Sequence, residues 1–221
     1  MSGILEVIYE DSNVLMVNKL AAVPVLPDKS GDNSIKDFLH AMRPGHFFEA
    51  AHRLDRRTSG IVAFGKTKHG VAELSEAFRE HRIQKIYWAA VENKPKTSSG
   101  TLSHKLLHDG RKNVTHAVRA TKKDKGDIAE LAFELIGESE RYFLLAVRPL
   151  QGKTHQIRAQ LAAEGMPIRG DLKYGAHRST GNGLIMLHAR NLKVDMGKSG
   201  TIEATAPTPD DEPLWCAFIQ N

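Results

Sequence analysis

Apolar residues in the first half of the chain follow two patterns. Short continuous or alternating runs indicate strands, and a spacing of three to four residues indicates helices. Short apolar runs bounded by turn residues predict strands. Ile35, Leu39 and Met42 lie instead at helical spacing, after a cap at Asn33 or Ser34. We expect strands over residues 4–11, 14–19, 60–67 and 83–91, and helices over residues 33–42 and 68–82.

The second half begins with a basic stretch at residues 101–127, whose turn residues at 108–113 and 122–127 predict hairpins with exposed basic faces. One more helix is expected after residue 153, with Thr154 as its N-cap and Gly165 just past its C-terminus. The remaining expected elements are a hairpin over 129–137 and 141–150, a strand over 183–194 and a loop over 205–213.

Strands outnumber helices in this pattern, and no regular alternation of strand, helix and strand is present. This favours an α+β fold with a mixed, mostly antiparallel central sheet flanked by helices. The length of 221 residues fits one domain, which we expect to consist of two lobes that share the sheet. No internal repeat interrupts this pattern.

Composition and charge narrow the possible partners. Hydrophobic residues make up 41% of the chain and the net charge is +5, which suits a polyanionic partner without requiring one. The single cysteine, Cys216, excludes an intrachain disulfide and a cysteine-based zinc site. The N-terminus does not resemble a signal peptide, and the apolar runs fall short of the roughly 20 residues of a membrane span. We therefore expect a cytoplasmic protein that does not enter the membrane.

The segment AHRLDRRTSG, residues 51–60, places one carboxylate, Asp55, among several basic residues. Nearby cations favour the charged form of a carboxylate, so we expect Asp55 to stay ionised at neutral pH. An ionised carboxylate suits a nucleophile or a base and not a general acid. The alternative interpretation is an exposed loop whose charges only balance one another.

Three further features carry possible chemistry. Tyr87 lies in an expected strand, where a tyrosine is commonly a core residue. Arg158 and His155 share one face of the expected helix after residue 153, which also fits an ordinary amphipathic helix. Lys153, Thr154 and the free N–H groups at this helix start would suit a phosphate. His104 and His108 are four residues apart without the glutamate of a metalloprotease motif, so we expect no metal site.

Read in order, five segments resemble the RluA-type RNA pseudouridine synthase family. They are HRLDRRTSG, KIYWAAV, GKTHQIR, GMPIRGDLKYG and LIMLHA, and the resemblance extends over nearly the whole chain. It implies the pseudouridine synthase fold, with an active-site cleft across the sheet. It also implies an enzyme that isomerises uridine to pseudouridine in structured ribosomal or transfer RNA.

The resemblance also implies roles for particular residues. Asp55 matches the essential aspartate, Tyr87 the active-site tyrosine and Arg158 an arginine that would pair with the aspartate. Leu187 matches a residue that lines the uracil pocket, and Arg53 matches one that fills the gap left by the extruded base. The expected RNA- or substrate-binding residues are His52, Arg53, Arg56, Arg57, Lys153, Thr154, His155, Gln156 and Leu187.

The sequence departs from the family pattern at two positions of the chain. Lys19-Leu20-Ala21-Ala22 stands where the family commonly has Lys-Pro-Ala-Gly, which predicts a differently bent loop. Lys153 follows Gly152 where the family usually has arginine. Lysine keeps the positive charge of arginine but cannot make its bidentate contact with a phosphate.

The resemblance includes only the catalytic domain, so we expect no separate N-terminal RNA-binding module. We also expect a monomer that needs no metal or organic cofactor. Two other functions stay open. One is a non-catalytic RNA-binding protein that retains the fold, and the other is a hydrolase that uses Asp55 and a histidine.

Overall fold

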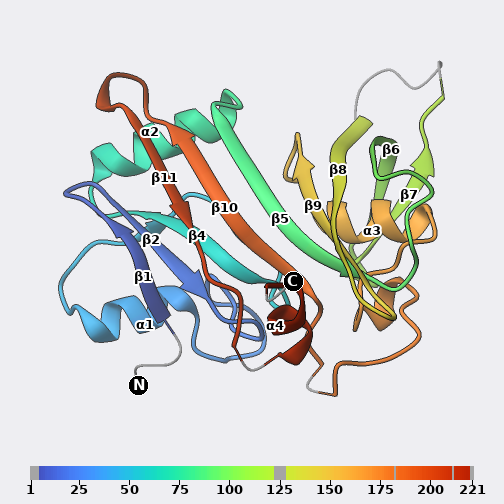
Figure 1. Cartoon of the computed structure of the whole chain (residues 1–221). Coiled ribbons are helices and arrows are strands. Elements are labelled where there is room, and N and C mark those ends of the chain that lie inside the picture. The colour runs from blue at the N-terminus through green and yellow to red at the C-terminus, as the bar shows by residue number, and fades with distance from the viewer. Residues whose placement is uncertain (1–4, 122–127, 182, 211, 220–221) are drawn as a thin grey trace. The chain divides into compact units, whose positions relative to one another are not determined.

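The computed structural model describes residues 5–121, 128–181, 183–210 and 212–219. Strands dominate it, nearly all of them antiparallel, and the few helices pack on them (Figure 1), which confirms the predicted α+β class. The chain divides into two compact units. Unit 1 contains Met1–Lys85 and His188–Pro209, and unit 2 contains Ile86–Leu187 and Asp210–Asn221.

Unit 1 is built on strands whose continuous apolar runs are buried on both faces. In β2 and β4 every residue is buried, and the two strands pair antiparallel. β1 pairs antiparallel with β2, β10 runs parallel to β4, and β11 lies antiparallel on β10. The strands are β1 (Leu5–Glu10), β2 (Val14–Lys19), β3 (Glu49–Ala50), β4 (Ser59–Gly65), β10 (Leu187–Asp195) and β11 (Thr201–Thr205).

Two capped helices complete this unit, together with the short 3-10 helix η2 (Gly197–Ser199). α1 (Ile35–Met42) begins with a capping box in which Ser34 and Asp37 satisfy each other's backbone N–H groups, so the predicted cap at Ser34 is confirmed. α2 (Lys68–Arg79) is capped by Thr67 and buries Leu74 and Ala77 in the hydrophobic core of unit 1.

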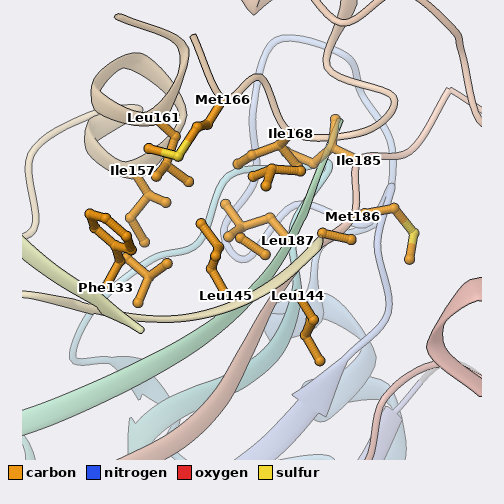
Figure 2. Close-up of a cluster of buried hydrophobic side chains, with 14 of the residues drawn as sticks. Phe133, Leu144, Leu145, Ile157, Leu161, Met166, Ile168, Ile185, Met186 and Leu187 are labelled. Atoms are coloured by element: carbon orange, nitrogen blue, oxygen red, sulfur yellow. The ribbon is translucent and has the colours of Figure 1, made fainter. Parts of the chain in front are cut away.

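Unit 2 contains an antiparallel sheet in the order β5-β9-β8-β6-β7. These strands are β5 (Ile83–Val91), whose first three residues belong to unit 1, β6 (Ser99–Asp109), β7 (Val114–Arg119), β8 (Ile128–Glu138) and β9 (Phe143–Pro149). Its helices are α3 (Gln156–Ala163), the 3-10 helix η1 (Leu172–Tyr174) and α4 (Pro213–Ile219). Figure 2 shows its core, where Ile157 and Leu161 of α3 lie among residues of β8 and β9.

Two elements near the C-terminus differ from the sequence-based expectation. Residues 201–205 form β11, which was not predicted because only Ile202 and Ala204 give it an apolar pattern. The strand forms by antiparallel pairing with β10. α4 begins at Pro213, within the segment expected to be a loop, and Trp215 anchors it in the core of unit 2. The predicted turn at 108–113 is confirmed by the β6–β7 hairpin, whereas the turn at 122–127 lies outside the described residues.

Candidate active site

Asp55 lies in the loop that joins β3 to β4 in unit 1. Its carbonyl oxygen accepts a hydrogen bond of 3.0 Å from the backbone N–H of Thr58, which closes a turn. The side chain of Asp55 is half-buried, whereas those of Arg53, Arg56 and Arg57 are exposed. The loop thus places three partly or fully exposed cations around a carboxylate that is half-buried.

Arg56 uses its guanidinium group to join two loops of unit 1. Its Nε donates a hydrogen bond of 2.8 Å to the carbonyl oxygen of Ala22, and its Nη2 donates to the carboxylate of Asp32. Asp28 lies 4.0 Å from Nη1. These contacts tie the Asp55 loop to the loop that follows β2, which gives Arg56 a structural role in addition to its predicted contact with RNA.

Lys19, the last residue of β2, holds the same two loops together from inside the protein. Its side chain is fully buried, and its Nζ donates to the carbonyl oxygens of Leu20 at 3.0 Å, Val23 at 2.9 Å and Arg56 at 3.2 Å. Burial lowers the pKa of Lys19 to about 7, and the negative charge of Asp55 acts in the opposite direction. Sequence reasoning missed this role, although a lysine that ends a continuous apolar run was a signal for it.

Ala22, in the loop held by Lys19, has a backbone conformation that favours glycine. Its φ angle is 71°, in the left-handed region, and it stands where the family commonly has glycine. For a residue with a side chain, this conformation is about 1–2 kcal/mol less stable than the right-handed one. The departure at Ala22 therefore leaves strain in this loop.

We expect Ala22→Gly to raise the free energy of unfolding by about 0.5–1 kcal/mol, since relief of the strain exceeds the entropy lost by glycine. Urea unfolding of the purified protein measures this difference. Ala21→Gly is the matched control, because Ala21 is not among the residues with positive φ, and it should lower the stability. Equal losses in both variants would contradict the strain at Ala22.

The start of β4 is fixed by the closest approach of two parallel strands. Ser59 lies opposite His188 and Gly60 opposite Ala189, and the Ser59 Oγ is 2.9 Å from the His188 Nδ1. Gly60 has a φ of 110°, and a Cβ there would lie 2.3 Å from the carbonyl oxygen of Ala189. The Thr-Ser-Gly and Leu-His-Ala segments thus join β4 to β10 directly after the Asp55 loop.

Burial lowers the pKa of His188 to about 4, against 6.5 for an ordinary histidine. Below pH 6.5 the unfolded chain takes up a proton that folded His188 does not, so stability is lost as the pH falls from 6.5 to 4. The loss from this group is about 3 kcal/mol. Urea unfolding between pH 7 and pH 4 should show that the free energy of unfolding depends less on pH in His188→Gln than in the wild type. The exposed His69→Gln should retain the wild-type dependence.

His52, predicted to contact RNA or substrate, takes part in the packing of unit 1. Its Nε2 accepts a hydrogen bond of 3.1 Å from the backbone N–H of Ala63, and its ring stacks on Phe78 with centroids 4.8 Å apart. Burial, and to a smaller extent the charge of Lys85, lowers the pKa of His52 to about 3. The ring is therefore neutral, and its Nε2 and one ring contact serve the packing of unit 1.

In unit 2, α3 begins later than predicted. Its N-cap is His155 with a φ of 52° and no capping side chain, so the prediction of Thr154 as N-cap is wrong. The carbonyl oxygen of Thr154 accepts a hydrogen bond of 2.9 Å from the Thr115 hydroxyl, which ties this residue to β7. Gly165, with a φ of 76°, ends the helix as predicted.

The four residues predicted around this helix start divide into two pairs. Lys153 and Thr154 are exposed and stay open to solvent, whereas His155 and Gln156 are buried. The His155 Nδ1 lies 2.9 Å from the Tyr174 hydroxyl. The Gln156 side chain accepts from the Lys153 N–H at 3.1 Å and donates to the Glu130 carbonyl at 3.0 Å.

Arg158 is the most deeply embedded of the predicted site cations. Only 4% of it is exposed, and its Nε and Nη2 donate to the two carboxylate oxygens of Asp171 at 2.7 and 2.8 Å. Its guanidinium carbon also lies 4.9 Å from the centre of the Tyr174 ring. Asp171 and Tyr174 belong to the GDLKYG segment, so this segment orients Arg158. The predicted pairing of Arg158 with Asp55, which belongs to unit 1, stays a prediction.

Tyr87 and Leu187 both belong to the hydrophobic core of unit 2. Tyr87 is half-buried on β5 opposite Val147 of β9, and Leu187 is 4% exposed. Figure 2 shows Leu187 near Leu145 and Ile168 within the same cluster that contains Ile157, one residue before Arg158. Three of the predicted site positions therefore lie in or next to a single packed cluster.

Within the described ranges, no three metal-ligating side chains come together in a group. In that same part of the chain, no helix is long and apolar enough to cross a membrane.

A sequence model of the family described as RNA pseudouridylate synthase matches residues 13–163, which include Asp55, Tyr87 and Arg158. The chain belongs to this family. Its members isomerise uridine to pseudouridine in RNA, and the resemblance to the RluA type predicted from five segments is confirmed.

Relatives and solved structures agree with this assignment. An uncharacterized RNA pseudouridine synthase of Zymomonas mobilis is 32% identical over 92% of this chain and 93% of the relative. Ribosomal large subunit pseudouridine synthase C of Vibrio parahaemolyticus is 33% identical over 85% of this chain, which spans 60% of that relative's length. The structure of human RNA Pseudouridylate Synthase Domain Containing 1 matches with a TM-score of 0.78 and 25% identity, over 93% of this chain and 84% of that one.

Proposed function

We propose that this pseudouridine synthase acts in the cytoplasm on specific uridines of ribosomal or transfer RNA, with Asp55 as its essential carboxylate. The observation that carries the proposal is the family match over residues 13–163, because it includes the Asp55 loop, Tyr87 and Arg158. Ribosomal RNA is supported further by the names of relatives such as the ribosomal large subunit synthase of Vibrio parahaemolyticus.

The reaction is an isomerisation, so substrate and product contain the same atoms. The bond between the ribose C1′ and the uracil N1 breaks, the base turns, and a bond forms between C1′ and C5. The proton on C5 leaves and N1 gains one. The uracil has to leave the base stack to be reached, so the protein must stabilise an extruded nucleotide.

In this proposal the catalytic residues, Leu187 and the residues around Asp55 have the following tasks. Asp55, as an anion, attacks the nucleoside or removes a proton from it, and Arg158 steadies the carboxylate. Tyr87 stacks on the uracil, and Leu187 lines its pocket. Arg53 and Arg57 are exposed and bind RNA phosphates. His52 and Arg56 act through the packing of the Asp55 loop, which is what their contacts in unit 1 support.

Comparison of pseudouridine in total RNA from cells with and without the protein tests this function. A uridine modified only when the protein is present identifies the substrate. Purified protein should also release tritium from RNA labelled at uridine C5, whereas a protein that only binds RNA would release none. Strand cleavage instead of tritium release would indicate a hydrolase.

A further inference from the structure

The β6–β7 hairpin of unit 2 ends in a turn that presents two cations in a fixed conformation. The Asp109 Oδ1 accepts hydrogen bonds from the backbone N–H groups of Arg111 at 2.9 Å and Lys112 at 3.2 Å. Asn113 completes the turn with a φ of 49°. The only carboxylate of residues 104–119 is thus engaged in shaping the turn, while the side chains of Arg111 and Lys112 extend into solvent.

A third cation joins this turn from a different segment. Lys173 of η1 is exposed, and its Nζ donates a hydrogen bond of 3.3 Å to the carbonyl oxygen of Asn113. We call Arg111, Lys112 and Lys173 the cationic turn patch. None of the three is in an ion pair with a carboxylate in the part of the chain that the structure describes. Their charges are therefore available to an anionic partner.

The cationic turn patch adjoins the residues that orient Arg158. The backbone N–H of Thr115, two residues after the turn, donates a hydrogen bond of 2.8 Å to the Tyr174 hydroxyl. Tyr174 directly follows Lys173, and its ring lies against the guanidinium of Arg158. One hydrogen bond and one ring contact thus connect the hairpin to Arg158, within unit 2.

We propose that the cationic turn patch binds the phosphates of RNA next to the target uridine. The inference rests on the proposed function and names a surface for it. Lysine and arginine bind the RNA backbone without regard to sequence and so position the strand. A preformed turn beside Arg158 can hold the flanking phosphates while the uridine is extruded.

The triple variant Arg111→Ala, Lys112→Ala, Lys173→Ala tests the proposal by the salt dependence of binding. The probe is an in vitro transcript of bacterial large-subunit ribosomal RNA, measured by filter binding at several salt concentrations. Each lost phosphate contact lowers the steepness of log K against log salt by about 0.7–0.9, so three contacts lower it by about 2–3. We expect the dissociation constant near physiological salt to rise on the order of tenfold.

The matched control is Lys68→Ala, Arg79→Ala, Lys198→Ala, which removes three exposed cations of unit 1 and changes the net charge equally. A charge-retaining variant, Arg111→Lys, Lys112→Arg, Lys173→Arg, should keep the wild-type salt dependence. If the first triple variant binds with the affinity and salt dependence of the control, the proposal is wrong. All variants should unfold at the same urea concentration, because the altered side chains are exposed.

Measurements of RNA binding and of turnover distinguish a failure of this proposal from a failure of the function on which it rests. Absence of tritium release by the wild-type protein would overturn the proposed function, whereas the salt dependence would still report on the patch. Normal wild-type turnover with an unchanged Michaelis constant in the patch variant would overturn the patch alone.

Discussion

Asp55→Asn lowers the rate of pseudouridine formation at least about 1,000-fold while the protein stays folded and still binds RNA. The amide has nearly the shape of the carboxylate but lacks the charge, so it can neither attack the nucleoside nor accept a proton efficiently. The turn of this loop is closed by the carbonyl oxygen of Asp55 and the backbone N–H of Thr58, and the substitution leaves both groups in place. Tritium release under single-turnover conditions measures the loss.

Glu203→Gln is the matched control, since it neutralises an exposed carboxylate on β11 of the same unit. It should turn over at the wild-type rate. A tenth or more of wild-type activity in carefully purified Asp55→Asn would exclude Asp55 as the essential group, and the functional assignment of the loop would have to change.

Asp171→Asn produces the second large effect, on stability. The carboxylate of Asp171 is fully buried and receives two hydrogen bonds from Arg158, so its neutralisation removes the negative charge that these two bonds pair with the buried guanidinium. Removal of one partner of such a buried pair destabilises a protein by about 3–5 kcal/mol. Urea unfolding should show this loss.

The control for Asp171→Asn is Glu138→Gln, which breaks the exposed ion pair with Lys94 and should change the stability by less than about 1 kcal/mol. The double variant with Arg158→Leu removes both charges and should recover part of the loss. Equal stability of Asp171→Asn and wild type would show that the pair does not hold Arg158 in place.

The elements with a strong local pattern could be predicted from the sequence. The apolar runs of β2 and β4 and the Ser34 cap are local features, and the structure has them where the sequence indicates. The start of α3 could not be predicted in this way. Thr154 is a good capping residue, but its carbonyl is bound by Thr115, which lies 39 positions earlier in the sequence. A tertiary contact therefore overrides the local preference.

The site residues follow the same rule. Asp55, Tyr87 and Arg158 could be named because each belongs to a recognisable segment. The supporting roles of Asp171 and Lys19 were missed, since both act through tertiary contacts. Only the position of Lys19 at the end of an apolar run gave a local signal. Even the crowding of arginines around Asp55 was only partly informative, because the guanidinium of Arg56 is directed to Asp32 and Ala22.

The three hydrogen bonds of Lys19 go to main-chain oxygens, and every amino acid supplies one. Residues 20 and 23 can therefore be substituted during evolution without loss of the hydrogen bonds that the Lys19 ammonium group donates. The position of the Asp55 loop therefore does not depend on which side chains residues 20 and 23 carry. Residues 20 and 23 could accordingly be replaced, for example to reshape the neighbouring surface, provided that Lys19 is retained and that residue 22 can adopt its positive φ angle.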